Sequence, residues 1–412
     1  SRMDHPQNSL FVAVRSKIEW LAGKLSRVTS TGELIPEIDG LRFIAISAVL
    51  FHHLLAMFLS GSGRSAEVRT YAQWVAAADQ SWLVIPAYCG HFGVNLFFVI
   101  SGFILALPFA KRALNQQAAP NLKSYYLRRV TRIEPPYLIS LIAIFLIHWR
   151  QWGVGPEALP NLIASFFYSH NLVYGRESVI NGVTWSLEIE IQFYLLTPLL
   201  VLMFRLRNAA ARRAMILASI IGFGVLSQWV IYPSGSARLP LTLLNFAHYF
   251  LTGFLLADLY LTGPLRSDDK RLTWDIVTLG AAAAIIATLT RFGQYYFLLP
   301  LMVGLLYAGF FLGRLSNAFA RSRWIVIIGG MCYTIYLYHI LIISNLMTQT
   351  MPMASIRRSF DLDFALQLLL ILPMVFAGCA LLFFFTEKPF MRWSLSSRPA
   401  KDLKAAQVAA AD

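Results

Sequence analysis

The chain has 412 residues, of which 57% are hydrophobic and only 14% are charged. A soluble domain usually has about 45–50% apolar and about 25% charged residues, so this composition excludes an ordinary soluble enzyme, a disordered chain and a small disulfide scaffold. The net charge is +14, but the basic residues lie between apolar runs and form no continuous stripe, which argues against nucleic acid as a partner.

Apolar runs of about 20 residues recur along the chain, and each is long enough to cross a bilayer as an α-helix. We therefore predict an all-α fold, a polytopic transmembrane bundle of about ten helices surrounded by membrane lipid. Two shorter apolar segments, 72–88 and 158–174, are expected to be interfacial or re-entrant, with an eleventh crossing as the alternative. The predicted spans are residues 38–59, 91–110, 133–149, 184–204, 214–232, 241–262, 273–290, 295–313, 324–346 and 363–386.

The distribution of Lys and Arg predicts the orientation of these spans. With a cytoplasmic N-terminus, every predicted cytoplasmic segment carries at least three Lys or Arg, and no predicted external segment carries more than two. Both termini are therefore expected in the cytoplasm. We expect a cytoplasmic segment over 1–37, a transmembrane domain over 38–388 and a cytoplasmic tail over 389–412. Helical spacing of apolar residues over 10–25 predicts an interfacial amphipathic helix, with an unstructured segment as the alternative.

The first predicted span contains ionisable residues, which cost at least about 2.5–3.5 kcal/mol each inside a bilayer and are therefore functional candidates. Arg42 and His53 share one face of this helix, about 16 Å apart along its axis, whereas His52 points about 80° away. This spacing suits an elongated anionic ligand, with Arg42 at the cytoplasmic entrance and His53 near mid-membrane. The alternatives are an Arg42 that extends to the interface and a histidine that is hydrogen-bonded in the core.

The start of the third predicted span reads SYYLRRVTRIEPPYL. This segment contains three arginines at helical spacing, Arg128, Arg129 and Arg132. Their guanidinium groups can bind phosphates in a bidentate geometry. We expect the Pro135-Pro136 pair to fix a turn at this point. Ordinary positive-inside anchoring is the alternative interpretation of these arginines, and both interpretations stay open on the residues alone.

Two further spans contain candidate residues. The fourth, NGVTWSLEIEIQFYLLTPLL, places two carboxylates within the membrane, on Glu188 and Glu190, which suit orienting an imidazole, pairing with Arg or binding sugar hydroxyls. Trp185 and Tyr194 are either interfacial aromatics or walls of a substrate site. The ninth span carries His339, and a lone histidine on an apolar helix is more often structural. The segment TEKPFMRW after the tenth span is interpreted as simple termination.

Six motifs occur in a fixed order across this frame: DGLRFIAISAVLFHH, GVNLFFVISGFIL, YLRRVTRIEPPYL, TWSLEIEIQFYL, YTIYLYH and TEKPFMR. Together they make residues 37–392 resemble the integral-membrane acyltransferase-3 family, whose members include bacterial polysaccharide and lipopolysaccharide O-acetyltransferases. The resemblance implies transfer of an acyl group, with acetyl as the first choice, from cytoplasmic acyl-CoA to a hydroxyl of a glycan at the outer face. It also implies a multi-pass location in the inner membrane of a bacterium.

The resemblance carries over to particular residues. Arg42 and His53 match the family's Arg-x10-His pair, and Arg129 and Arg132 match its Arg-x-x-Arg pair. Glu190 matches the first Glu of the family's Trp-Ser-Leu motif, and His339 matches its late-helix His. We therefore expect catalytic roles for His53, Glu190 and Arg42. Binding of the CoA phosphates is expected from Arg42, Arg129 and Arg132, with Arg128 beside them, and substrate contacts from Trp185, Tyr194, His339 and Tyr336. Acyl-CoA is the expected donor, and no metal is expected.

The sequence also departs from the family pattern. Asn95 and Cys332 stand where the family often has Asp and Ser, and Ile191 replaces a second Glu, so a second catalytic glutamate is not expected. We expect no esterase-like domain after the tenth span, and therefore expect the membrane domain or a partner to handle the acceptor. Two other functions stay open, which are acylation of a small molecule such as an antibiotic and proton-coupled transport or flipping. Buried His, Glu and Arg are typical of proton-coupled carriers, but no repeats or paired broken helices are visible.

Overall fold

The computed structural model describes residues 34–63, 70–118, 120–153, 155–354 and 359–391, together with residues 19, 23, 25 and 26. Within these ranges the chain is built from helices and contains no β-strand. The predicted all-α class is therefore confirmed. The expected amphipathic helix over 10–25 falls almost entirely outside the described residues, as does most of the expected C-terminal tail.

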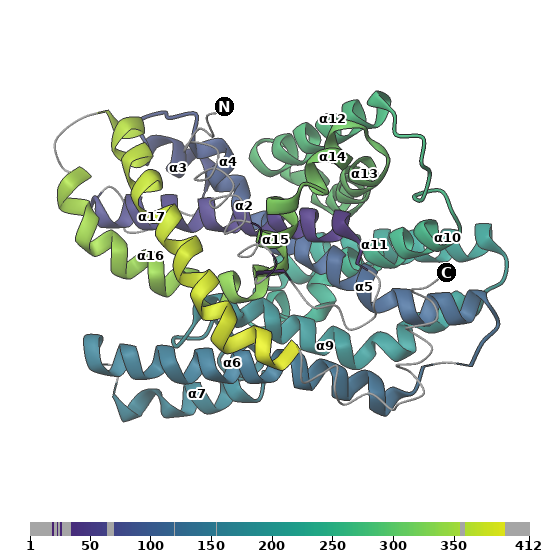
Figure 1. Ribbon diagram of the computed structural model, residues 1–412, viewed down its shortest axis with the longest axis horizontal. Helices are drawn as coiled ribbons and strands as arrows, with labels where there is room; N and C mark the ends of the chain where they lie inside the picture. The colour runs from purple at the N-terminus through teal and green to yellow at the C-terminus, as the bar shows by residue number, and fades with distance from the viewer. Residues whose placement is uncertain are drawn as a thin grey trace, which may run out of the picture.

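Nine helical segments of the described chain are long and apolar enough to cross a membrane, and a tenth candidate is a helix pair bent by 71°. They correspond one by one to the predicted spans. Most of these long helices lie side by side (Figure 1). They are α2 (Pro36–Gly61), α5 (Gly93–Leu114), α6 (Leu122–Trp152), α9 (Trp185–Leu200), α10 (Ala209–Leu226), α11 (Leu243–Leu261), α12 (Leu272–Thr290), α13 (Leu299–Leu312), the bent pair α15 (Arg323–Gly330) and α16 (Cys332–Ala354), and α17 (Phe360–Leu382).

The two shorter apolar segments form short helices and add no crossing. The first holds α3 (Tyr71–Ala77) and α4 (Val84–Cys89), and the second holds α7 (Leu159–Phe166) and α8 (His170–Tyr174). The longest of these four helices, α7, has 8 residues, which is too short to span about 30 Å of hydrocarbon. Because α4 continues into α5 through a short 3-10 turn, the second span begins at Val84 and not at residue 91.

The turn expected at Pro135-Pro136 is wrong. Both prolines lie inside α6, which is continuous over 31 residues. Proline removes a backbone donor, but membrane helices tolerate it where neighbouring groups and small local adjustments satisfy the freed carbonyl. The basic segment before the prolines is therefore a rigid helix that projects beyond the apolar part of the span.

α2 runs through the middle of the bundle, with α15 close to its start (Figure 1). Its residues enter both hydrophobic cores, because Leu41 packs in one core and Leu54 in the other. A Cβ on Gly329 would overlap the carbonyl oxygen of Asp39, so glycine lets α15 touch the backbone of α2 there. Asp39 in turn lies 2.5 Å from the guanidinium of Arg42. The break between α15 and α16 is thus held beside Arg42.

α5 and α11 also approach at backbone distance. A Cβ on Gly102 or on Gly253 would overlap backbone atoms of the facing helix. Lipid tails are as apolar as leucine, so membrane helices associate through small residues that allow such close packing. This contact fixes α5 against α11 and positions the polar residues that both helices carry.

Gly253→Ala is expected to destabilise the bundle by about 1–3 kcal/mol, because the added methyl group pushes α5 and α11 apart. The measurement is the thermal unfolding midpoint of the purified protein in detergent. Gly280→Ala is the matched control, since no heavy atom lies within 4 Å of a Cβ built on Gly280. That substitution should be neutral or mildly stabilising in a helix. Equal midpoints for the two variants would contradict the close contact.

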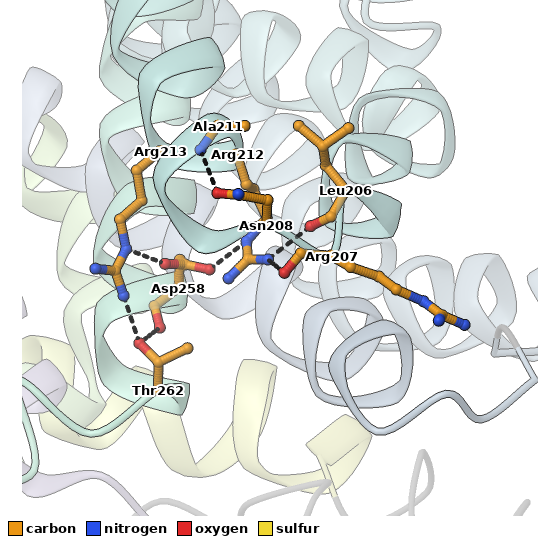
Figure 2. Close-up of polar contacts among 8 residues, drawn as sticks. All are labelled: Leu206, Arg207, Asn208, Ala211, Arg212, Arg213, Asp258 and Thr262. Carbon is orange, nitrogen blue, oxygen red and sulfur yellow. Dashed lines mark hydrogen bonds and ion pairs between the residues drawn. The ribbon is translucent and has the colours of Figure 1, made fainter.

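A buried ion-pair cluster ties the start of α10 to the end of α11 (Figure 2). Asp258 is fully buried and accepts hydrogen bonds from Arg212 Nε at 2.6 Å and from Arg213 Nε at 2.7 Å. Arg212 is also buried and donates to the carbonyl oxygen of Leu206, 2.7 Å away, just beyond the end of the fourth span. In the sequence both arginines contribute only to the positive-inside pattern, whereas in the structure they connect three spans.

Candidate functional site

A cavity of about 140 Å³ lies where α2, α5, α6, α9 and the bent pair meet. We call it the arginine cavity because three of the arginines selected from the sequence line it: Arg42, Arg129 and Arg132. Three other selected residues line it as well: Glu190, Tyr194 and Tyr336. These side chains come from α2, α6, α9 and α16, so the folded bundle, and not local sequence, brings them together.

The arginines at the start of α6 are not equivalent. The guanidinium carbon of Arg129 lies 5.9 Å from the centre of the Tyr194 ring, within the range of a cation–π contact. Arg132 lines the cavity beside it. Arg128 donates to the hydroxyl of Ser124 at 2.7 Å and is absent from the described residues that line the cavity. The structure therefore groups Arg129 and Arg132 with Arg42 and places Arg128 elsewhere.

Glu190 is the centre of the polar contacts in the arginine cavity. The hydroxyls of Ser101 on α5 and of Tyr194 on α9 both donate to its Oε1. The positive charges of Arg129 and Arg132 act on the same carboxylate, and such attraction is strong where water is scarce. Ser101 was not selected from the sequence, although the motif GVNLFFVISGFIL contains it. Glu190 is thus held in place by two hydroxyls and faces two guanidinium groups.

The neighbouring carboxylate, Glu188, has a different environment. It is 1% exposed, and its two oxygens accept hydrogen bonds from the backbone N–H groups of His170 at 3.2 Å and Asn171 at 2.8 Å. Residues two apart on a helix point in nearly opposite directions. One carboxylate of the pair therefore faces the cavity, and the other anchors the short helix α8 to the bundle.

Glu387 is a further cavity residue, and the interpretation of TEKPFMRW as simple termination gives it no such role. It lines the arginine cavity and is 2% exposed. Its Oε2 accepts hydrogen bonds from the backbone N–H of Thr334 at 3.2 Å and from the Thr334 hydroxyl at 2.6 Å. The residue ends a π-helical turn after α17, and such turns are frequent at functional sites. The feature of the sequence that could have indicated this role is an acidic residue directly after an apolar run.

A second cavity, of about 330 Å³, is lined by four histidines, and we call it the histidine cavity. They are His52, His53, His91 and His248. Trp185, which was expected to form a substrate wall, lines this cavity and not the other. The helical spacing predicts one elongated site for Arg42 and His53, but in the structure each lines a different cavity. In the described part of the chain, no group of three or more His, Cys, Asp or Glu is arranged to hold a metal ion.

Aromatic rings that line the two cavities contact one another. Phe98 lines the arginine cavity, and Trp185 and Phe246 line the histidine cavity. The ring centres of Phe98 and Trp185 are 6.4 Å apart, and those of Trp185 and Phe246 are 5.6 Å apart. These rings come from α5, α9 and α11, so the spacing of residues along α2 gives no sign of them. Contacts among them link a residue of the arginine cavity to residues of the histidine cavity.

His339 contacts one residue of each cavity and is fully buried. Its ring centre lies 5.2 Å from that of His53 and 6.3 Å from that of Tyr336. Its Nδ1 lies 2.9 Å from the carbonyl oxygens of both Ile335 and Tyr336. Carbonyl oxygens only accept, so Nδ1 carries the hydrogen and Nε2 the lone pair. Nε2 is buried and has no hydrogen-bond partner among the described residues, which leaves it available to accept a proton beside His53.

Up to ten candidate spans in the described part of the chain, together with an arginine cavity and a histidine cavity, define a polytopic membrane protein with an internal polar site. The chain belongs to the acyltransferase-3 family, whose acyltransferase domain matches residues 35–384. The resemblance seen in the six ordered motifs is therefore confirmed at the level of the family.

Among curated proteins, the chain is similar to the peptidoglycan O-acetyltransferase OatA of Listeria monocytogenes. The two are 28% identical over 347 residues, which cover 75% of this chain and 49% of that protein. The chain is also similar to the O-acetyltransferase OatA of Staphylococcus aureus, with 24% identity over 74% of this chain and 50% of that protein. It thus spans about half the length of the curated relatives it matches. No solved structure matches the chain.

Proposed function

We propose that the protein is a membrane O-acetyltransferase that moves an acetyl group from acetyl-CoA to a hydroxyl of a cell-surface glycan. The observation that carries this proposal is the pairing of the arginine cavity with the histidine cavity, with His339 in contact with a residue of each. Membership of an acyltransferase family supports the reaction type. The names of the two relatives support acetyl as the group transferred and, for one of them, a glycan as the acceptor.

The donor belongs in the arginine cavity. Guanidinium groups match the geometry and charge of phosphate oxygens, and Arg42, Arg129 and Arg132 all line this cavity. The positive-inside rule places the basic start of α6 on the cytoplasmic side, where acyl-CoA is available. A volume of about 140 Å³ has room for the thioester end of the donor and not for the whole of CoA, so the nucleotide end of CoA stays at the mouth. Glu190 holds the arginines in position on this donor side.

The transfer step uses His53. The acceptor hydroxyl oxygen attacks the thioester carbonyl carbon, the C–S bond breaks, and CoA leaves as its thiolate. His53 takes the hydroxyl proton as general base and passes it to the leaving sulfur. The unprotonated Nε2 of His339 has no hydrogen-bond partner among the described residues, so in the working complex it would accept the N–H of His53 and leave the other His53 nitrogen to the acceptor. A one-step transfer and a transient acetyl-His53 both use this same nitrogen.

Arg129→Ala is expected to weaken CoA binding by about 10- to 100-fold, because one charge-assisted contact to phosphate is lost. The measurement is calorimetric titration of CoA into the purified protein. Arg128→Ala is the matched control, since it removes the same charge from the same helix but from a side chain that pairs with Ser124. Equal losses of CoA affinity in both variants would show that the arginines act only through the general positive charge of the helix. Unchanged CoA affinity in Arg129→Ala would contradict the donor site.

The bent pair α15 and α16 is the feature that favours a carrier, because broken membrane helices are typical of transporters. It is the single such pair that the described residues contain. Purified protein given acetyl-CoA and a glycan acceptor separates the two functions by mass spectrometry of the acceptor. Gain of an acetyl group supports the enzyme, whereas acceptor movement across proteoliposomes without acetylation contradicts it. The same assay with a hydroxylated antibiotic as acceptor tests the small-molecule alternative.

A further inference from the structure

The histidine cavity has the lining of a sugar site. Its volume of about 330 Å³ falls within the ordinary range of small-molecule sites, about 300–1,000 Å³. Aromatic side chains from the fourth, fifth, sixth and eighth spans form its walls: Trp185, Tyr232, Phe246, Tyr249 and Tyr296. Aromatic rings of this kind combine a flat apolar face with a polar edge. A sugar ring offers the matching surfaces, with C–H groups on its faces and hydroxyls around its rim.

Polar side chains between these walls are fixed in place by other parts of the protein. Gln228 accepts from the backbone N–H of Phe297 at 2.9 Å and donates to the carbonyl oxygen of Gln294 at 2.7 Å. Asn245 accepts from the hydroxyl of Ser227 at 2.6 Å. Both amides line the cavity. A ligand here therefore meets a rigid polar wall, and ordering that wall costs no entropy at the moment of binding.

His248, on the wall of the cavity, has a ring nitrogen with no hydrogen-bond partner in the described part of the chain. The side chain lines the cavity and is 3% exposed, and its Nδ1 has no hydrogen-bond partner among the described residues. A buried polar nitrogen without a partner is costly, and nearly all such atoms in folded proteins are paired with protein, water or ligand. A hydroxyl group on a bound ligand would supply the missing hydrogen bond.

The charges around the histidine cavity contrast with those of the arginine cavity. No Lys or Arg stands among the described residues that line it, and its one carboxylate, Glu177, is exposed at the edge. A carboxylate or phosphate on a ligand would find no Lys or Arg here. Burial raises the pKa of the Glu177 carboxyl, and its ionised form would repel such a ligand. An uncharged ring meets neither penalty.

We propose that the histidine cavity binds an uncharged sugar ring as the acetyl acceptor and discriminates against acidic sugars. The inference rests on the proposed function for the direction of transfer, because His53 lines this cavity and would meet the bound hydroxyl. The aromatic walls stack on the ring, His248 bonds one hydroxyl, and Glu177 excludes anionic rings at the mouth.

The test uses the full chain in lipid nanodiscs and two matched probes, methyl β-D-glucopyranoside and methyl β-D-glucuronide, which differ only in a carboxylate that replaces the primary alcohol. Saturation-transfer NMR measures the binding of each sugar without a donor. We expect the neutral glycoside to bind at least about tenfold more tightly than the acid, because like charges oppose the acid. Equal affinities, or no binding of the neutral sugar, overturn the proposal.

Two variants sharpen this test. His248→Ala should weaken binding of the neutral glycoside by about three- to tenfold, the loss of one hydrogen bond. Glu177→Lys changes an exposed side chain and should reduce the preference for the neutral glycoside by about threefold or more. An unchanged ratio in Glu177→Lys overturns the charge argument even if His248→Ala fails to fold. CoA titration runs in parallel, so that loss of CoA binding marks a failure of the proposed function and loss of sugar binding alone marks a failure of this inference.

Discussion

His53→Ala is expected to abolish acetyl transfer, with a loss of at least about 10²–10⁴-fold, because the general base and any acetyl-carrying nitrogen both disappear. CoA binding should stay unchanged, because His53 lines the histidine cavity and the donor belongs in the arginine cavity. The two measurements are acetylation of a glycan acceptor by mass spectrometry and calorimetric titration of CoA. Intact CoA binding shows that the variant is folded.

His52→Ala is the matched control for this prediction. His52 is the adjacent residue and lines the same cavity, but its Nδ1 donates to the carbonyl oxygen of Ala87 at 2.9 Å and its ring stacks on Trp74. We expect a loss of less than about tenfold, because a side chain tied to α4 contributes packing and no base. Wild-type turnover in His53→Ala, or equal losses in both variants, would contradict the role assigned to His53.

Asp258→Ala is expected to destabilise the protein by about 3–5 kcal/mol, because it leaves the buried charge of Arg212 uncompensated and removes a partner of Arg213. Asp258 is fully buried and Arg212 is 1% exposed, so water cannot replace the lost carboxylate. The measurement is the free energy of unfolding in detergent with increasing denaturant. Size-exclusion chromatography would show the same effect as a loss of monodisperse protein.

Asp269→Ala provides the comparison for Asp258→Ala. Asp269 lies 2.5 Å from Arg271, but both side chains are more than half exposed. Exposed ion pairs contribute at most about 1 kcal/mol, so this variant should unfold almost like the wild type. Similar stabilities for the two variants would show that the cluster in Figure 2 is an ordinary surface pair and not a connection between spans.

The positions of the spans are largely predictable from the sequence because hydropathy and chain length are local properties. Local patterns fail where tertiary packing decides the outcome. Pro135 and Pro136 read as a turn, yet α6 continues through them, because a bundle can satisfy a membrane helix around proline. Arg212 reads as a topology signal, yet Asp258, which pairs with it, lies 46 residues further along the chain.

Most residues of the candidate site could be predicted from the sequence, but their distribution over two cavities could not. Arg42, Arg129 and Glu190 were selected from the sequence, and the structure places all three around one cavity. His53 lines the other cavity, together with residues such as Trp185 that come from other helices. The helical repeat predicts which residues share a face of α2. It does not predict which residues of other helices pack against that face.

The central claim is that one chain passes an acetyl group from the arginine cavity to the histidine cavity. Sealed proteoliposomes test it most directly, with labelled acetyl-CoA outside and methyl β-D-glucopyranoside trapped inside. Molecules inserted with the arginine cavity outward should place the label covalently on the trapped sugar while acetyl-CoA stays outside. Label on the sugar only when donor and sugar share one compartment, or no label at all, would contradict the claim.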